Sequence, residues 1–105
     1  MWPNFLRFFK RRVYEPKNWV VTDAGRPLFR LEYLDWRDNW LQYRVVYLEG
    51  TAELWKYASD RRTDPRQFGW MLEEVGGNGK VPLSYAMILG TEDPHLAVVK
   101  FVGPP

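Results

Sequence analysis

The chain has no cysteine and a single histidine, His95. Without cysteine there can be no disulfide bond, no thiolate metal ligand and no cysteine nucleophile. Catalytic triads, zinc sites and much general acid–base chemistry use histidine, so one histidine leaves little from which to build any of them. His95 follows Pro94 in a stretch typical of a hairpin loop, where we expect an ordinary surface residue. We therefore expect no enzyme: no catalytic residues, no cofactor and no resident metal.

Long apolar runs are also missing. Outside the first residues the longest such run is 85–89, far short of the ~20 residues that a membrane-spanning helix needs. At the N-terminus the basic residues follow the apolar ones, the reverse of their order in a secretory signal peptide. Small secreted domains commonly depend on disulfides, so the lack of cysteine favours a reducing compartment. We expect a cytoplasmic protein without a transmembrane segment.

The composition is that of one folded domain covering residues 1–105, with 46% hydrophobic residues. The net charge is +2, but it is unevenly distributed. Residues 1–30 hold seven Lys and Arg against two acids, a balance of +5, whereas residues 31–105 hold eight against eleven, a balance of −3. The N-terminal part is therefore basic and the rest of the chain is mildly acidic. This distribution indicates a charged N-terminal end and not a uniformly basic nucleic-acid binder.

Turn signals and β-branched or aromatic residues predict most of the chain as strands. The expected strands are 18–22, 28–34, 40–48, 81–89 and 96–102. The strongest helix pattern covers 65–75, where Asp64 is a suitable N-cap, Pro65 suits the first position and Gly76 follows the end. Residues 51–58 fit a helix and a fourth strand equally well. The sequence predicts an α+β fold, an antiparallel sheet of about five to six strands with one or two helices packed on one face.

The aromatic content is the most unusual feature, with six Trp, six Tyr and six Phe. Trp, Tyr and Arg are the residues that dominate protein-binding hot spots. Trp36 and Trp40 flank a polar turn, and Arg37 and Asp38 lie between them. We expect this turn to be exposed and to contact another protein, and these four residues are the predicted partner-binding site.

The same turn carries a resemblance to a known family. The stretch from Asp35 to Leu41, followed by an alternating strand and then a predicted helix at 65–75, resembles the WapI-type immunity proteins over roughly residues 28–75. Proteins of that family neutralise the toxin domain of a contact-dependent bacterial toxin by binding to it. The resemblance implies an immunity-type inhibitor, with Asp38, Asn39, Trp40 and Leu41 carrying the motif.

The N-terminal segment 1–12 leaves other functions open. It fits a short helix that docks on the domain, one that contacts an acidic protein or nucleic acid, or one that lies on an anionic membrane. For nucleic acid, basic side chains would neutralise phosphates while aromatic side chains stack on bases; the candidates are Arg7, Lys10, Arg11 and Arg12. The leading hypothesis is a non-catalytic protein-binding module, and the alternative is a nucleic-acid-binding accessory protein. An open sheet edge would also allow dimerisation.

Overall fold

The computed structural model describes residues 16–38, 40–60 and 69–102. The predictions for segment 1–12, including the four basic residues at its end, and for Asp64 and Pro65 lie outside these described residues.

A three-stranded antiparallel meander forms the first half of the fold, at the positions predicted from the sequence. Its strands are β1 (Trp19–Asp23), β2 (Arg26–Arg37) and β3 (Trp40–Tyr47). Ala24 and Gly25 both adopt left-handed backbone conformations, as a tight hairpin turn requires. β2 is longer than predicted and continues to Arg37, so the turn expected from residue 35 begins only at Asp38, which has a φ of 50°.

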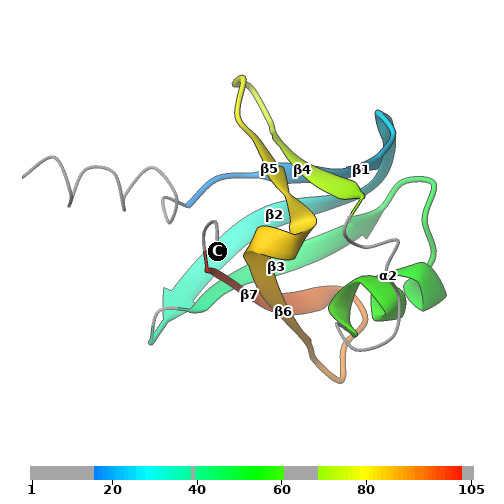
Figure 1. The fold of residues 1–105 in the computed structure, drawn as a ribbon. Coiled ribbons are helices and arrows are strands. Elements are labelled where there is room, and N and C mark those ends of the chain that lie inside the picture. The colour runs from blue at the N-terminus through cyan, green and yellow to red at the C-terminus, as the bar shows by residue number, and fades with distance from the viewer. Residues whose placement is uncertain (1–15, 39, 61–68, 103–105) are drawn as a thin grey trace, which may run out of the picture.

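The remaining strands extend the meander on both sides. They are β4 (Trp70–Glu74), β5 (Lys80–Pro82), β6 (Ala86–Gly90) and β7 (Leu96–Phe101). In the described residues the sheet has seven strands in the order β5-β4-β1-β2-β3-β7-β6, and all neighbours are antiparallel. The sheet curls into a half-barrel, and the 3₁₀ turn η2 (Leu83–Tyr85) carries the chain from the β5 edge to the β6 edge (Figure 1).

The predicted helix over 65–75 is wrong where the structure describes it, because residues 70–74 form β4. Trp70 and Leu72 are buried while the residues between and after them face the other way, which is the period of two of a strand. β4 pairs with β1 on one side and β5 on the other. The apolar positions of this short segment fit a helical stripe and a strand equally well, and pairing within the sheet decides between them.

Two further predictions need correction. The single strand expected over 81–89 is two strands, β5 and β6, separated by η2. Pro82 ends β5, because proline has no N–H to continue a ladder. Five to six strands were predicted. Because of this split and the additional strand β4, the described residues form seven. The coarser prediction of an α+β fold with an antiparallel sheet and helix is confirmed.

The ambiguous segment 51–58 is helical, and it closes the open side of the half-barrel. Helix α2 (Ala52–Ser59) begins at Thr51, whose Oγ1 accepts a hydrogen bond from the Leu54 N–H at 3.4 Å. Its apolar side buries Trp55 and Ala58 in the core. The helix also packs against β6, the strand at one edge of the sheet. The other edge, β5, is short and carries Lys80 and Pro82, which discourage strand addition.

Phe29 lies at the centre of the aromatic core, inside the half-barrel. Its ring centroid is 5.7 Å from that of Tyr47, 5.2 Å from that of Trp55 and 6.0 Å from that of Trp70. The chain leaving β3 passes so close that a Cβ on Gly50 would lie 2.3 Å from the Phe29 ring. Glycine at position 50 is therefore required by packing against the core.

Replacing Gly50 with alanine should destabilise the fold by about 1–3 kcal/mol, because the Phe29 ring or the backbone of residue 50 must move. Urea denaturation of wild type and variant would measure the loss. Gly90→Ala is the matched control, since its added methyl group would meet nothing closer than 3.8 Å. A Gly50→Ala protein as stable as Gly90→Ala would contradict the close packing described above.

A second core feature is a buried hydroxyl. Tyr43 is fully buried, and neither its hydroxyl nor the indole N–H of Trp19 has a hydrogen-bond partner of good geometry among the described residues. Burial raises the pKa of Tyr43 from 10.0 to about 12, and the indole of Trp19 opposes this rise. An unpartnered buried hydroxyl contributes little to stability and costs its desolvation.

Tyr43→Phe should therefore be about as stable as wild type at neutral pH, or more stable. The two proteins should differ at alkaline pH. Below pH 10 Tyr43 is protonated in both the folded and unfolded states; as the pH rises towards 12 only the unfolded state ionises, so the wild type loses on the order of 2 kcal/mol. Tyr43→Phe lacks this loss, and denaturation series from pH 8 to 11.5 would show whether the two curves diverge as stated.

Candidate protein-binding face

Strands β3, β7 and β6 turn alternate residues away from the core, because side chains of a strand point to opposite sides in turn. On the core side Leu41, Tyr43, Ala97, Val99 and Ile88 are buried. On the opposite side a set of cross-strand neighbours is left without cover from described residues. We call this set the outer patch; it consists of Trp40, Gln42, Met87, Leu89, Val98 and Lys100.

The outer patch is ordered in two rows across the strands. In one row Gln42 pairs with Val98, and Val98 pairs with Leu89. In the other row Met87 pairs with Lys100, whose Nζ lies 5.9 Å from the centroid of the Trp40 ring. Directly opposed side chains in antiparallel strands lie within contact distance, so each row is continuous.

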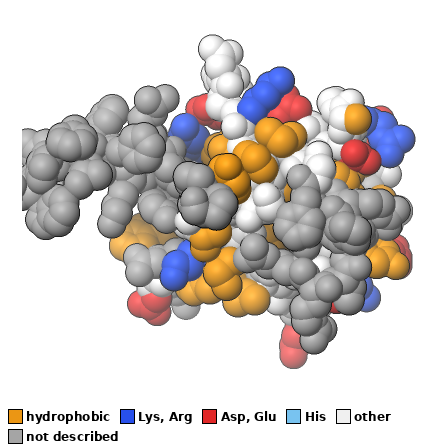
Figure 2. All heavy atoms as spheres, in the orientation of Figure 1, with side chains coloured by type: hydrophobic (Ala, Val, Ile, Leu, Met, Phe, Trp, Pro, Cys, Tyr) orange, Lys and Arg blue, Asp and Glu red, His pale blue; other side chains and the backbone are white. Residues whose placement is uncertain are grey.

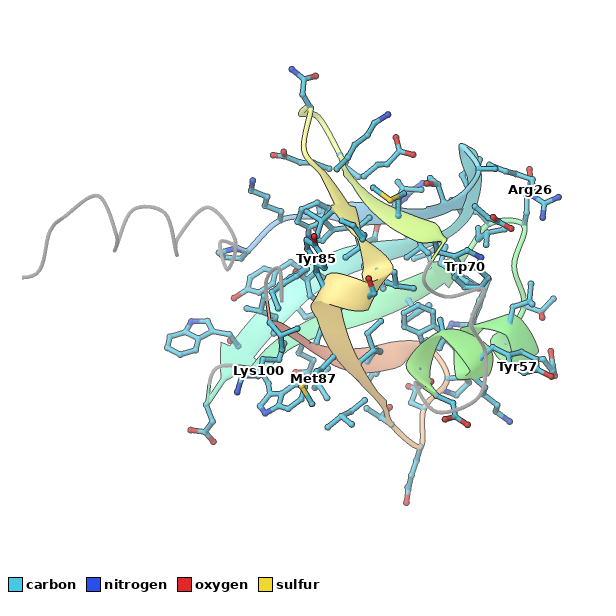
Figure 3. All side chains as sticks on the ribbon, viewed as in Figure 1. Arg26, Tyr57, Trp70, Tyr85, Met87 and Lys100 are labelled. Atoms are coloured by element: carbon cyan, nitrogen blue, oxygen red, sulfur yellow. The ribbon has the colours of Figure 1, made fainter. Side chains whose placement is uncertain are left out.

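Several members of the outer patch are large, apolar and exposed. Met87 is 36% exposed and Leu89 is 51% exposed, while Trp40 and Val98 are half-buried. Figure 2 shows hydrophobic side chains gathered on one face of the molecule, and Figure 3 shows Met87 and Lys100 next to each other beside β6 and β7. Scattered apolar residues on a surface need no explanation, but a contiguous set on one sheet face is typical of an interaction site.

A groove continues the outer patch at the other end of β3 and β7. It is lined by Arg44, Val46, Tyr47, Asp93, His95 and Leu96. The Tyr47 hydroxyl donates to the Pro94 carbonyl, and the backbone N–H of His95 donates to Asp93 Oδ1 at 2.8 Å, which fixes the loop that forms one wall. Burial, followed by the charges of Asp93 and Glu53, raises the pKa of Tyr47. Arg44 is exposed at the groove and lies directly across from Leu96.

His95 lies in the loop before β7 and is exposed, as expected from the sequence. Its Nδ1 lies 3.4 Å from the Val45 carbonyl oxygen, and its ring packs edge-on to Tyr47 at 5.2 Å. Across the described ranges, no group of three or more His, Asp or Glu side chains could hold a metal ion.

The structure places the predicted partner-binding residues on a single hairpin but divides its two tryptophans. Trp36 lies opposite Leu41, a core-side residue, whereas Trp40 lies opposite Arg37 and belongs to the outer side. Trp36 itself is 59% exposed. Trp36 and Trp40 therefore point to opposite faces of the hairpin, and Asp38 is in the turn between them.

Sequence reasoning missed the contribution of β6 and β7 to this surface. The residues that it did not single out are Met87, Leu89, Val98 and Lys100. The uninterrupted apolar run over 86–89 held a usable signal, because a strand with apolar side chains at every position has two apolar sides, and only one can face this core. Which strands lie beside β3, and in which register, was not contained in any local pattern.

The chain matches no protein-family model, no curated protein and no solved structure. Over the described parts of the chain, no helix has the length and apolar character needed to cross a membrane.

The two sides of β6 should respond differently to substitution. Ile88→Ala removes a core side chain and should cost about 2–5 kcal/mol of folding free energy. Leu89→Ala, one residue further on, removes an outer-patch side chain and should change stability by less than about 0.5 kcal/mol. Urea denaturation of both variants would test the assignment, and equal losses would show that the outer patch is not a free surface.

Proposed function

We propose that the protein is a non-catalytic, cytoplasmic protein-binding module that uses the outer patch as its contact surface. The observation that carries this proposal is the pair of continuous rows across β3, β7 and β6, in which Trp40, Met87, Leu89 and Val98 are held apolar and accessible on a rigid sheet. A preformed surface of this kind binds without a large ordering cost.

The composition of the outer patch supports the proposal. It combines a tryptophan, a methionine and aliphatic side chains, while Gln42 within it and Arg44 in the adjoining groove supply polar groups towards one end. Binding hot spots have this arrangement, with buried aromatic and apolar anchors inside a polar rim. Trp40 is half-buried already, so it would lose little side-chain freedom when a partner covers it.

An immunity-type inhibitor is the specific form of this proposal that follows from the resemblance of residues 35–41 to the WapI-type family. Such an inhibitor needs only a stable surface that covers its target, which agrees with the proposed mode of action. The nucleic-acid alternative depends on Arg7, Lys10, Arg11 and Arg12, which lie outside the described residues.

The proposal is tested by affinity capture from native lysate followed by measurement of the Kd with the purified partner. Trp40→Ala and Leu89→Ser should each weaken binding by roughly 30-fold or more, as expected of hot-spot residues. Trp36→Ala tests the other face of the hairpin and should leave the Kd nearly unchanged.

Val75→Ser is the matched control for Leu89→Ser, because Val75 is 48% exposed but lies after β4, outside the outer patch. If Val75→Ser weakens binding as strongly as Leu89→Ser, the contact surface has been placed wrongly. Capture that disappears after nuclease treatment would instead favour the nucleic-acid alternative.

A further inference from the structure

Lys100 occupies an unusual position in the outer patch. It lies between Trp40, over whose ring its Nζ is held, and Met87, its direct cross-strand neighbour. Val98 precedes it by two residues on the same side of β7 and is half-buried. A cation is thus placed inside the apolar part of the surface rather than at its rim.

No carboxylate in the described part of the chain forms an ion pair with Lys100. The acids on the same side of the sheet are engaged elsewhere. Glu32 Oε2 lies 3.5 Å from Arg30 Nη1, and Asp35 Oδ1 accepts the Trp36 N–H at 2.7 Å. In the free protein, solvent and the face of the Trp40 indole balance the charge of Lys100.

A partner that covers Trp40 and Met87 removes this solvent. Burying an ammonium group without a counter-charge is strongly unfavourable, and a cation–π contact offsets only part of that cost. A partner that supplies an anionic oxygen to the Lys100 Nζ therefore buries this surface at the lowest cost.

From this we infer that the outer patch recognises an acidic protein segment, in which a carboxylate set among apolar side chains meets Lys100. This inference rests on the proposed function and names the chemistry of the partner. The apolar side chains would cover Met87, Leu89 and Val98. Arg44 has no ion-pair partner among the described residues either, and it offers a second, more exposed point for a carboxylate beside the groove.

Other occupants fit this surface less well. A second copy packed patch to patch about a two-fold axis would bring two Lys100 ammonium groups towards each other, which is repulsive. A nucleic acid would supply phosphates, but within the outer patch Trp40 is the one aromatic platform for a base, and Lys100 lies over its ring, while Leu89 and Val98 present aliphatic groups. The aliphatic row suits apolar side chains of a protein.

The experiment is a selection from a phage-displayed library of random peptides against the full chain. Wild type should enrich peptides that combine aromatic or aliphatic residues with Asp or Glu. The Lys100→Glu protein should enrich peptides with Lys or Arg at the same positions instead. For one selected peptide, changing its acidic residue to the neutral amide should raise the Kd for wild type roughly 30-fold, and Lys100→Met should do the same, whereas Lys100→Arg should retain most of the affinity.

The change on the peptide leaves the folding of the protein untouched, so it remains informative if a Lys100 variant is unstable. Peptides that need Leu89 but show no preference for acids would overturn this inference and leave the proposed function standing. If the Leu89→Ser protein enriches the same peptides as wild type, or if no peptide is enriched, the inference and the proposed function both fail. Tight binding of an oligonucleotide that Lys100→Glu abolishes, or a homodimer that Leu89→Ser dissociates, would also overturn it in favour of that occupant.

Discussion

The packing of aromatic side chains around Phe29 is the constraint on which the rest of the structure depends. Phe29 joins β2, β3, β4 and α2, because its ring contacts Tyr47, Trp55 and Trp70 within 6.0 Å. A sheet curled this strongly leaves an open side, and Trp55 fills it from the helix. The close passage of Gly50 lets the chain turn from β3 into that helix without displacing the ring. One side of β3, β7 and β6 packs against this core. Because side chains alternate along each strand, the side chains between them lie on the outer surface.

The parts of the fold that the sequence predicts correctly are those with a local signal. The β1–β2–β3 meander has clear turn signals and alternating strands, and its three strands are found where expected, although β2 continues to Arg37. The helix expected at 65–75 is wrong over residues 70–74 because the apolar residues there fit both periods. Met71, Leu72 and Val75 recur at helical spacing, whereas Trp70 and Leu72 recur at the period of two of a strand. That strand is stabilised by pairing with β1, some fifty residues earlier in the chain, and no local pattern contains such a pairing.

The candidate site shows the same limit. Trp40 is recognisable in the sequence as an exposed aromatic beside a turn, and it belongs to the outer patch. Its neighbours Met87 and Lys100 are brought to it by the register of β3, β7 and β6, which is a property of the whole sheet. Trp36, although close to Trp40 in sequence, points to the other side of the hairpin because pairing with Leu41 fixes its face. Proximity in sequence was therefore a poor guide to proximity on the surface.

The curl of the half-barrel has a consequence for the shape of anything that binds it. Since the core lies inside the curve, the outer patch lies on the convex surface of the sheet (Figure 1). A flat partner would touch only the crest of such a surface, and shape complementarity at a stable interface requires close contact across its centre. The fitting partner is therefore concave, a cradle or a flexible segment that bends around the strands, and its geometry would be as selective as its charge.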